Sequence, residues 1–403
     1  MAADAAGTRE AALPPLWLSL SLLWLAGICL RLTLLAVPPL LPTIHHDLHL
    51  DETAVGALTA LPVLILALAS VPGSLLVAHL GARRVLALGL ILVGAGGALR
   101  GLGHATLLLF VMTVLMGAGI AVAQPTLPSL ARAWCGVRNG LATATYSNGL
   151  LIGEIASAAL TAPLLIGLVG GNWSLALAAW SLPVALTALA VLGTPRTAGG
   201  RTAVPARWWP DWRSGRTWRL GLVLGCAGIS YFAGNTFIPE YLKTEGHANL
   251  VDPALTSLNL AQLPVSFLIL AIPNRLIGRR MPFIVAGALI MLAAVGFSAA
   301  IGPGYPVGAV FWAGLLGMAA GSAFTLSLAL PPLVSPPHDV HRLSAAMFTI
   351  SYSLAFAGPL VGGAIWDHTG RPALAFIPII SAGALMILLA IGLIVPGHEH
   401  PVS

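Results

Sequence analysis

Long apolar runs separated by short polar segments dominate this sequence and limit what it can fold into. Hydrophobic residues make up 58% of the 403 residues and charged residues only 8%, whereas about 25% of the residues in an average soluble domain are charged. A soluble fold could not cover so apolar a surface with polar groups. Because about 20 apolar residues cross a bilayer as a helix, the sequence predicts an all-α protein with twelve membrane-spanning helices.

The polar segments between the apolar runs set the ends of these twelve predicted spans. In chain order the spans are 16–41, 53–79, 84–103, 106–130, 139–168, 172–193, 218–242, 254–276, 282–301, 306–334, 343–366 and 372–395. The longest polar segment, residues 194–217, is rich in arginine and tryptophan and divides the spans into six and six. We therefore predict an N-terminal six-helix bundle (1–193), a cytoplasmic linker (194–217) and a C-terminal six-helix bundle (218–403).

Basic residues are distributed unevenly between the two sides of the predicted membrane. Most of the 19 Lys and Arg residues fall on the side of the N-terminus: Arg9, Arg83, Arg84, Arg132, Arg138, Arg196, Arg201, Arg207, Arg213, Arg216, Arg219, Arg275, Arg279, Arg280 and Arg342. The positive-inside rule then places both termini in the cytoplasm, and we expect a multi-pass protein of the cytoplasmic (inner) membrane. The net charge of +6 thus reports orientation in a lipid bilayer, and no nucleic-acid partner is expected.

One arginine breaks this pattern because it lies well inside the first apolar run. Arg31 is the only charged residue between positions 16 and 41. A charged side chain in hydrocarbon costs about 3 kcal/mol or more, so it faces a protein interior or a watery cavity. Guanidinium offers a rigid fork of donors that suits planar anions, and we expect Arg31 to bind an anionic or strongly polar substrate. The alternative is a structural arginine paired with Glu154 or with helix-end carbonyls.

Two further charged residues lie in or beside the predicted spans. Arg100 follows an apolar run near the outer interface; it either binds the substrate or extends its charge into water at that interface. Glu154 is the only acid well inside a predicted span, because Glu240 lies two residues before the end of the seventh. It could pair with Arg31, contact the substrate or couple transport to protons. Burial and a neighbouring arginine act on a carboxyl group in opposite directions, so these three roles stay open.

Uncharged polar residues inside the spans complete the set of candidate binding residues. Gln124 precedes Pro125 and Pro128, which favour either a simple kink or a hinge beside a polar ligand. The other candidates are amides and tyrosines on predicted helix faces: Tyr146, Asn148, Tyr231, Asn235, Asn259, Gln262 and Tyr352.

Spacing groups some of these residues on shared helix faces. Tyr231 and Asn235 are four residues apart, and Asn259 and Gln262 are three apart, so each pair lies on one face of its helix. Tyr352 belongs to a stripe with the aromatic residues four positions before and after it, Phe348 and Phe356. Such stripes serve helix packing more often than they form the wall of a ligand site.

Motifs for other kinds of chemistry are missing from the sequence. No loop of the form GxxxxGK[ST] occurs and the only lysine is Lys243, so we expect no ATP-driven transport by this chain alone. No combination of a nucleophile and a base indicates an enzyme. His45, His46 and His49 lie near acids in a predicted exposed loop, a composition more typical of solvated side chains than of a metal site. We expect no metal, no cofactor and no enzymatic activity.

Two short motifs link the sequence to a known superfamily. Residues 81–89 read GARRVLALG after the second span, and residues 277–287 read IGRRMPFIVAG after the eighth. They resemble the signature of the major facilitator superfamily between its helices 2 and 3, Gly-x-x-x-Asp-x-x-Gly-Arg-Arg. The chain keeps Gly81 and Arg83 of this signature. It departs at the first glycine, the aspartate and the first arginine, which are replaced by Ser74, Ala78 and Ala82.

A closer resemblance is to the cyanate permease and nitroimidazole transporter family. It rests on Leu30-Arg31 and on VPPLLP (37–42), LTALPVL (58–64), GALRGLG (97–103), GAGIAVAQPTLPSLARAW (117–134) and the Pro183-containing sixth span. The resemblance implies a secondary transporter that moves a small anion, such as cyanate, or a small polar nitrogen heterocycle. Helices 7, 8, 10 and 11 would line its cavity, and substrate would move in or out by alternating access.

Two alternatives to this interpretation remain. A drug or multidrug efflux pump of the same superfamily usually has a wide apolar cavity, which fits a buried arginine poorly. A non-transporting membrane receptor usually carries a soluble domain or a long tail for signalling. The partners expected for the main interpretation are a small, anionic substrate, the lipid bilayer and protons moving by symport, and the protein is expected to be a monomer.

Overall fold

The computed structural model describes residues 14–102, 105–194, 209–299 and 306–392. These residues form helices joined by short turns, and no strand occurs among them. Helix is the expected outcome for apolar runs in a bilayer, because a helix satisfies its backbone N–H and C=O groups internally where no water is available.

The first half of the described chain contains ten α-helices and three short helical turns. They are α1 (Leu16–Leu32), η1 (Pro38–Leu40), α2 (Leu41–Leu48), α3 (Glu52–Leu80), α4 (Ala82–Leu99), α5 (Thr106–Ala123), α6 (Thr126–Cys135), η2 (Gly136–Arg138), α7 (Asn139–Leu160), η3 (Thr161–Leu165), α8 (Ile166–Leu168), α9 (Trp173–Ala179) and α10 (Ser181–Gly193). Of the short turns, η3 is a π-helix and the other two are 3-10 helices.

The second half of the described chain continues in the same way. Its elements are α11 (Gly215–Thr244), η4 (Ala248–Leu250), α12 (Val251–Leu260), α13 (Gln262–Ala271), α14 (Pro273–Leu276), α15 (Arg280–Ala299), α16 (Pro306–Leu328), α17 (Leu330–Val334), α18 (Val340–Thr369), η5 (Pro372–Phe376) and α19 (Ile377–Ile391).

Ten helical stretches of the described residues are long and apolar enough to cross a membrane. One of them, Thr106–Leu160, has 55 residues; at about 1.5 Å per residue this is enough for two crossings of a bilayer. The shorter apolar helix Leu16–Leu32 precedes all ten. Together these stretches account for the twelve predicted spans in the predicted order.

Several spans predicted as single helices are interrupted. The first span was expected over 16–41, but α1 ends at Leu32 and the chain continues through η1 into α2. Residues 45–48, expected in an exposed loop, therefore belong to a helix. The fourth span is divided between α5 and α6 at Gln124 and Pro125, where a kink was expected. Breaks at membrane depth require neighbouring groups to satisfy the freed backbone atoms, so the end of α1 needs partners inside the protein.

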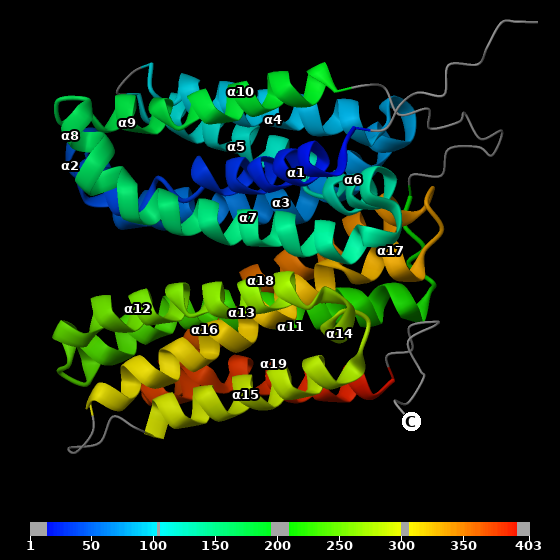
Figure 1. Cartoon of the computed structure of the whole chain (residues 1–403). Coiled ribbons are helices and arrows are strands. Elements are labelled where there is room, and N and C mark those ends of the chain that lie inside the picture. The colour runs from blue at the N-terminus through cyan, green and yellow to red at the C-terminus, as the bar shows by residue number, and fades with distance from the viewer. Residues whose placement is uncertain (1–13, 103–104, 195–208, 300–305, 393–403) are drawn as a thin grey trace, which may run out of the picture.

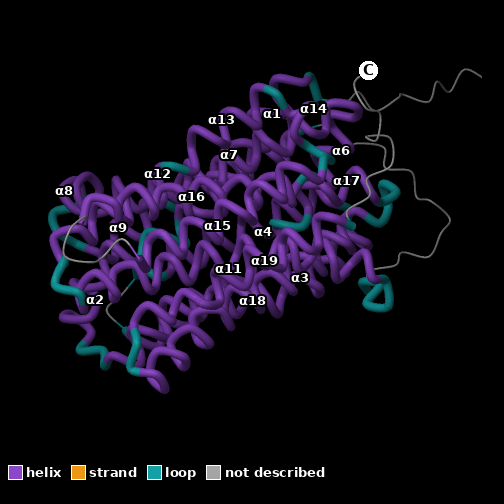
Figure 2. Tube along the Cα trace, turned by 90° about the horizontal axis from the view of Figure 1, so that it is seen from below, coloured by secondary structure: helices purple, strands orange, loops and turns teal. Residues whose placement is uncertain are grey.

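The helices form two layers, with α1–α10 in one and α11–α19 in the other (Figure 1). Figures 1 and 2 both place α2, α8 and α9 at one end of the molecule, here called the α2 end. Both views place α6, α14 and α17 at the opposite end, here called the α6 end. The predicted domain limits stay a prediction, because most of the linker expected over 194–217 lies outside the described residues.

Hydrogen bonds join the two layers in the middle of the molecule and at the α6 end. At the α6 end, Arg132 on α6 donates to the carbonyl oxygen of Pro332 (2.5 Å) and to that of Ser335, just after α17. Nearer the middle, the hydroxyl of Thr349 on α18 donates to the carbonyl oxygen of Ala67 on α3 at 3.0 Å. A guanidinium on free carbonyls at a helix C-terminus also complements the helix dipole.

Glycines let α1 and α7 pack backbone against backbone. A Cβ atom on Gly149 would lie 2.3 Å from the carbonyl oxygen of Trp24, and one on Gly153 would lie 2.3 Å from that of Ile28. Small residues spaced by four are the usual device for such close approach in membranes. This contact fixes where the last turn of α1, with Arg31, lies relative to Glu154, one residue after Gly153.

Gly153→Ala should therefore lower the free energy of unfolding by about 1–3 kcal/mol, the usual cost of overpacking a tight contact. The measurement is thermal unfolding of the purified protein in detergent. Gly363→Ala is the matched control, because Gly363 lies inside α18 and its added Cβ would meet nothing within 4 Å. Equal stability of the two variants would contradict the close α1–α7 contact.

Candidate functional site

Arg31 lies on the last turn of α1 and its side chain is only 7% exposed. Its Nη2 atom donates a hydrogen bond to the hydroxyl oxygen of Tyr352 on α18, at 3.3 Å. The Tyr352 hydroxyl in turn donates to Oε1 of Gln124, at 2.9 Å. This short chain of hydrogen bonds connects the two layers through three elements, namely α1, α18 and the break between α5 and α6.

Gln124 is the C-cap residue of α5 and is 2% exposed. Its Oε1 accepts from Tyr352, but its Nε2 has no hydrogen-bond partner. A buried donor without an acceptor costs about 1–3 kcal/mol. Gln124 lines neither of the two cavities described below. It accepts from the Tyr352 hydroxyl and so orients it.

Glu154 lies on α7 and faces the same space as Arg31. Its Oε1 atom is buried and has no hydrogen-bond partner. Arg31 and Glu154 attract each other electrostatically, yet they form no ion pair within 4 Å; the ion pairs among the described side chains join Lys243 with Glu240 and Arg342 with Asp339. The direct Arg31–Glu154 pair considered from the sequence is therefore absent in this conformation.

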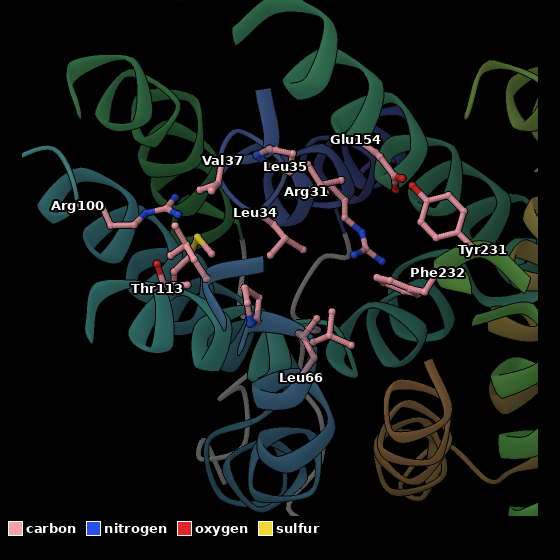
Figure 3. A pocket seen from close by; sticks show the side chains of 15 residues that line it. Arg31, Leu34, Leu35, Val37, Leu66, Arg100, Thr113, Glu154, Tyr231 and Phe232 are labelled. Atoms are coloured by element: carbon pink, nitrogen blue, oxygen red, sulfur yellow. The ribbon is translucent and has the colours of Figure 1, made fainter. Parts of the chain in front are cut away.

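Two cavities meet at these residues. Arg31, Glu154, Tyr231 and Phe232 line both of them, and Figure 3 shows these four side chains around one space. The first cavity extends within the first layer and is mostly apolar, with walls that include Leu34, Leu35, Pro38, Leu58, Pro62, Val63, Leu66 and Met116. The second lies between the layers, where its further lining includes Leu150, Leu151, Ala227, Gln262, Phe324, Ser351 and Tyr352.

Arg100 lines the first cavity on the side opposite Arg31 (Figure 3). It is the C-cap residue of α4 and is only 1% exposed. Its Nη2 atom donates to the carbonyl oxygen of Thr33 at 2.7 Å. The interfacial position considered from the sequence, with the charge in water, is therefore wrong. The reason is the break after α1, which leaves a carbonyl inside the protein for Arg100 to bind.

Three polar residues form a small cluster between α11 and α12. The Tyr231 hydroxyl donates to Oδ1 of Asn259 at 2.9 Å, and Nδ2 of Asn259 donates to Oδ1 of Asn235 at 3.3 Å. Nδ2 of Asn235 donates to the carbonyl oxygen of Tyr231 at 2.9 Å. Only Tyr231 of the three lines the cavities, so the two asparagines hold its ring in place.

Two candidate residues on α7 lie at the contact between the layers and do not line either cavity. The Tyr146 hydroxyl donates to the carbonyl oxygen of Leu328 at 3.2 Å. Asn148 accepts from Nε1 of Trp24 at 3.0 Å and donates to Oγ of Ser266 at 3.3 Å. Both are 1% exposed, so in this conformation they hold the layers together.

The sequence analysis missed several lining residues. Phe232 follows Tyr231 and Ser351 precedes Tyr352; adjacency to a candidate was the only signal for either. Phe348, assigned to a stripe, stacks on Tyr352 with ring centroids 6.0 Å apart and an interplanar angle of 19°. Among the described residues, no group of three His, Cys, Asp or Glu side chains is placed to hold a metal ion.

The family of the chain follows from its match to a family model. Residues 23–359 match the model described as Major Facilitator Superfamily. The chain belongs to this superfamily. The match covers most of the sequence and confirms the resemblance seen in the sequence motifs.

Two curated relatives from Escherichia coli (strain K12) narrow the comparison. The chain is 28% identical over 386 residues to the 2-nitroimidazole transporter, covering 93% of both chains. It is also 28% identical over 364 residues to the cyanate transport protein CynX, covering 87% of this chain and 91% of that relative. Both are transporters by name, and this superfamily member is a multi-pass membrane transporter.

Solved structures confirm the fold class. The chain is similar to the crystal structure of the superfamily transporter FucP in the outward conformation, with a TM-score of 0.72 and 14% identity, covering 92% of this chain and 97% of that one. The expected fold, twelve helices in two six-helix bundles, is therefore correct.

The arginine of the superfamily signature contacts the end of α10 in this member. The aspartate position is Ala78, which has no side-chain acceptor. Arg83 instead donates to the carbonyl oxygens of Leu192 (3.2 Å) and Thr194 at the end of α10. The signature arginine thus ties the turn between α3 and α4 to another helix of the same half.

Tyr352→Phe should lower the free energy of unfolding by about 1 kcal/mol through loss of its hydrogen bonds, and it should weaken transport because Arg31 loses its partner in the other half. Tyr241→Phe is the control, since the Tyr241 hydroxyl also donates to a carbonyl oxygen, that of Ser298 at 2.9 Å, but lines neither cavity. Unfolding and flux are measured on both variants. Equal flux in both would contradict a role for the Tyr352 hydroxyl in the site.

Proposed function

We propose that this protein is a secondary transporter that moves a small anion, or a small polar nitrogen compound, across the cytoplasmic membrane by alternating access. Arg31 is assigned as the principal substrate-binding residue. The observation that supports this assignment most strongly is its position: a guanidinium at the meeting point of two cavities, between the halves, with no carboxylate within 4 Å.

The charge of the cavities favours an anionic substrate. The charged side chains that line them are Arg31, Arg100 and Glu154, so the lining carries a net positive charge even when Glu154 is ionised. Guanidinium binds carboxylate or nitro groups through two parallel donors, and it can donate to a terminal atom of the linear cyanate ion. The names of the two relatives, a cyanate transporter and a 2-nitroimidazole transporter, support the same class of small, acceptor-rich molecules.

The other candidate residues divide by position. Tyr231, Gln262 and Tyr352 line a cavity with Arg31, and we assign them direct substrate contacts. Gln124, Asn235 and Asn259 act through the tyrosines that they hold. Tyr146 and Asn148 are assigned to the closed contact between the halves, which must open when the substrate leaves on the other side.

Glu154 is assigned to proton coupling. Its carboxyl group lines both cavities and has an oxygen without a hydrogen-bond partner, so substrate and proton can influence each other there through Arg31. A proton that binds Glu154 removes the negative charge opposite Arg31 and leaves the guanidinium free for an anion. This order favours symport of the anion with a proton.

The direction of access follows from orientation. With both termini in the cytoplasm, as the arginine distribution favours, the α6 end is cytoplasmic. The Arg132 contacts to the carbonyls of Pro332 and Ser335 then hold the cytoplasmic side closed, and the site opens outward in this conformation.

The moving bodies are the two bundles, 1–193 and 218–403, and the protein works as a monomer. Transport is the whole assigned activity, and we assign no enzymatic reaction or cofactor.

Arg31→Ala should reduce flux of cyanate or 2-nitroimidazole into proteoliposomes to the level of protein-free vesicles. Arg31→Lys should also be poor, because it keeps the charge but loses the planar fork. Arg84→Ala is the matched control, an exposed arginine at the other end of the same half. If Arg31→Ala transports cyanate or 2-nitroimidazole as well as the wild type, Arg31 does not bind the substrate.

Glu154→Gln should abolish accumulation driven by a proton gradient while leaving exchange of internal for external substrate, because the neutral amide mimics the protonated carboxyl group. The control is Glu240→Gln, which changes an exposed acid on α11. The assay compares gradient-driven accumulation with counterflow in the same vesicles. If accumulation by Glu154→Gln equals that of the wild type, Glu154 does not couple transport to protons.

A further inference from the structure

Arg100 is the largest charged side chain that the described structure buries almost completely, at 1% exposed. A guanidinium carries five N–H donors, and the structure gives this one a single acceptor, the carbonyl oxygen of Thr33 at 2.7 Å. Its Nε atom has no hydrogen-bond partner. Among the described side chains no carboxylate lies within 4 Å of it. Arg100 therefore holds an incompletely paired charge inside the protein.

The end of α1 compensates only part of this charge. Thr33 is the C-cap residue of α1, and the C-terminus of a helix is equivalent to about half a negative charge. Arg31 lies on the last turn of the same helix, so two guanidinium groups share one helix end. Arg31 also donates to the Tyr352 hydroxyl, whereas Arg100 has the Thr33 carbonyl alone. A buried charge without an opposite charge beside it is strongly unfavourable, and Arg100 has no carboxylate within 4 Å among the described side chains.

The surroundings leave room for a ligand at Arg100. Its side chain lines the first cavity, and Figure 3 shows its guanidinium directed toward the space that also contains Arg31. Apolar residues, including Leu34 and Val37, separate the two arginines along the wall. Thr113 lies beside Arg100 in the view, and its hydroxyl donates to the carbonyl oxygen of Leu109 at 2.7 Å. The lining next to Arg100 therefore contains no acid that would repel an anion.

We propose that Arg100 forms a second anion-binding station, separate from Arg31, for a small monovalent anion such as a halide, cyanate or a small carboxylate. An anion there would accept from Nη1, the guanidinium nitrogen that neither donates to Thr33 nor is among the buried atoms without a partner, and would complete the compensation that Thr33 begins. Two sources share this chemistry: the transported substrate on its way to Arg31, or an inorganic anion that stays bound while the substrate moves. The station goes beyond the proposed transport function, because it can be measured after Arg31 has been removed.

The test uses the purified full-length protein in detergent, with Arg31→Ala as background. Potassium bromide is titrated against potassium gluconate at constant ionic strength, and thermal unfolding is followed. A saturable stabilisation is expected in Arg31→Ala, and its apparent affinity should fall at least about tenfold in Arg31→Ala/Arg100→Gln, because a charge-assisted partner is lost. Arg31→Ala/Arg84→Gln is the matched control and should behave like Arg31→Ala alone. Absence of a saturable effect in Arg31→Ala, or an equal effect with and without Arg100, would overturn the proposal.

Arg100→Gln also removes the donor to Thr33, so the folded protein could be lost with it. A second measurement needs no variant: wild-type crystals grown in bromide should show an anomalous peak next to the Arg100 guanidinium. No peak there at saturating bromide would overturn the station. The anomalous peak does not depend on whether Arg31→Ala stops transport. The experiment therefore distinguishes failure of the anion site at Arg100 from failure of the transport proposal.

The source of the anion is decided by competition. If cyanate displaces bromide from Arg31→Ala at the concentrations that support flux in the wild type, the station serves the substrate. If flux in wild-type vesicles needs chloride and stops in gluconate, the station holds an inorganic anion. Either result identifies the source of the anion, and loss of that effect with Arg100→Gln supports the station at Arg100.

Discussion

The organising constraint of this structure is that α1 ends inside the protein rather than at the membrane surface. Ending there leaves backbone carbonyls free at membrane depth, and such groups must find donors. Two arginines lie at this point: Arg31 on the last turn, and Arg100 from the end of α4 on the carbonyl of Thr33. The break therefore explains why cationic side chains can be buried in so apolar a chain, and why a mostly apolar cavity has charged groups in its lining.

The same point also connects substrate binding with movement of the halves. Arg31 belongs to the first half, and its hydrogen-bond partner Tyr352 belongs to the second. An anion that takes Arg31 donors competes with this contact between the halves. A ligand shifts a conformational equilibrium only by binding one state better than the other. In the proposed mechanism this difference arises at Arg31 and Tyr352, while Arg132 and Tyr146 hold the α6 end closed through carbonyls of the other half.

Much of the architecture could be predicted from the sequence, because membrane-spanning helices depend on local composition. The twelve spans, their order and the break beside Gln124 follow from apolar length and from proline. The end of α1 at Leu32 could not be predicted: Pro38 and Pro39 favour a helix end close to them, but residues 33–37 are as apolar as the helix before them, except for Thr33. At the end of the helix, a residue distant in sequence, Arg100, donates to the carbonyl oxygen of Thr33.

The candidate site shows the same limit. Polarity within an apolar span correctly marked residues that lie inside the protein, including Arg31, Glu154 and Asn148. It could not tell which of them face a cavity, because Asn148 and Tyr231 have equally plausible helix faces. Asn148 contacts Trp24 and Ser266, whereas Tyr231 lines both cavities. That difference depends on how α7 and α11 are rotated in the packed bundle.

The measurement that tests the account most directly is a density map of the protein with its transported substrate bound. We expect density for the substrate between α1 and α18, in contact with the Arg31 guanidinium and with the Arg31–Tyr352 hydrogen bond lengthened or broken. A map in which Arg31 keeps its bond to Tyr352, closed off from a substrate that lies elsewhere, would contradict the central claim.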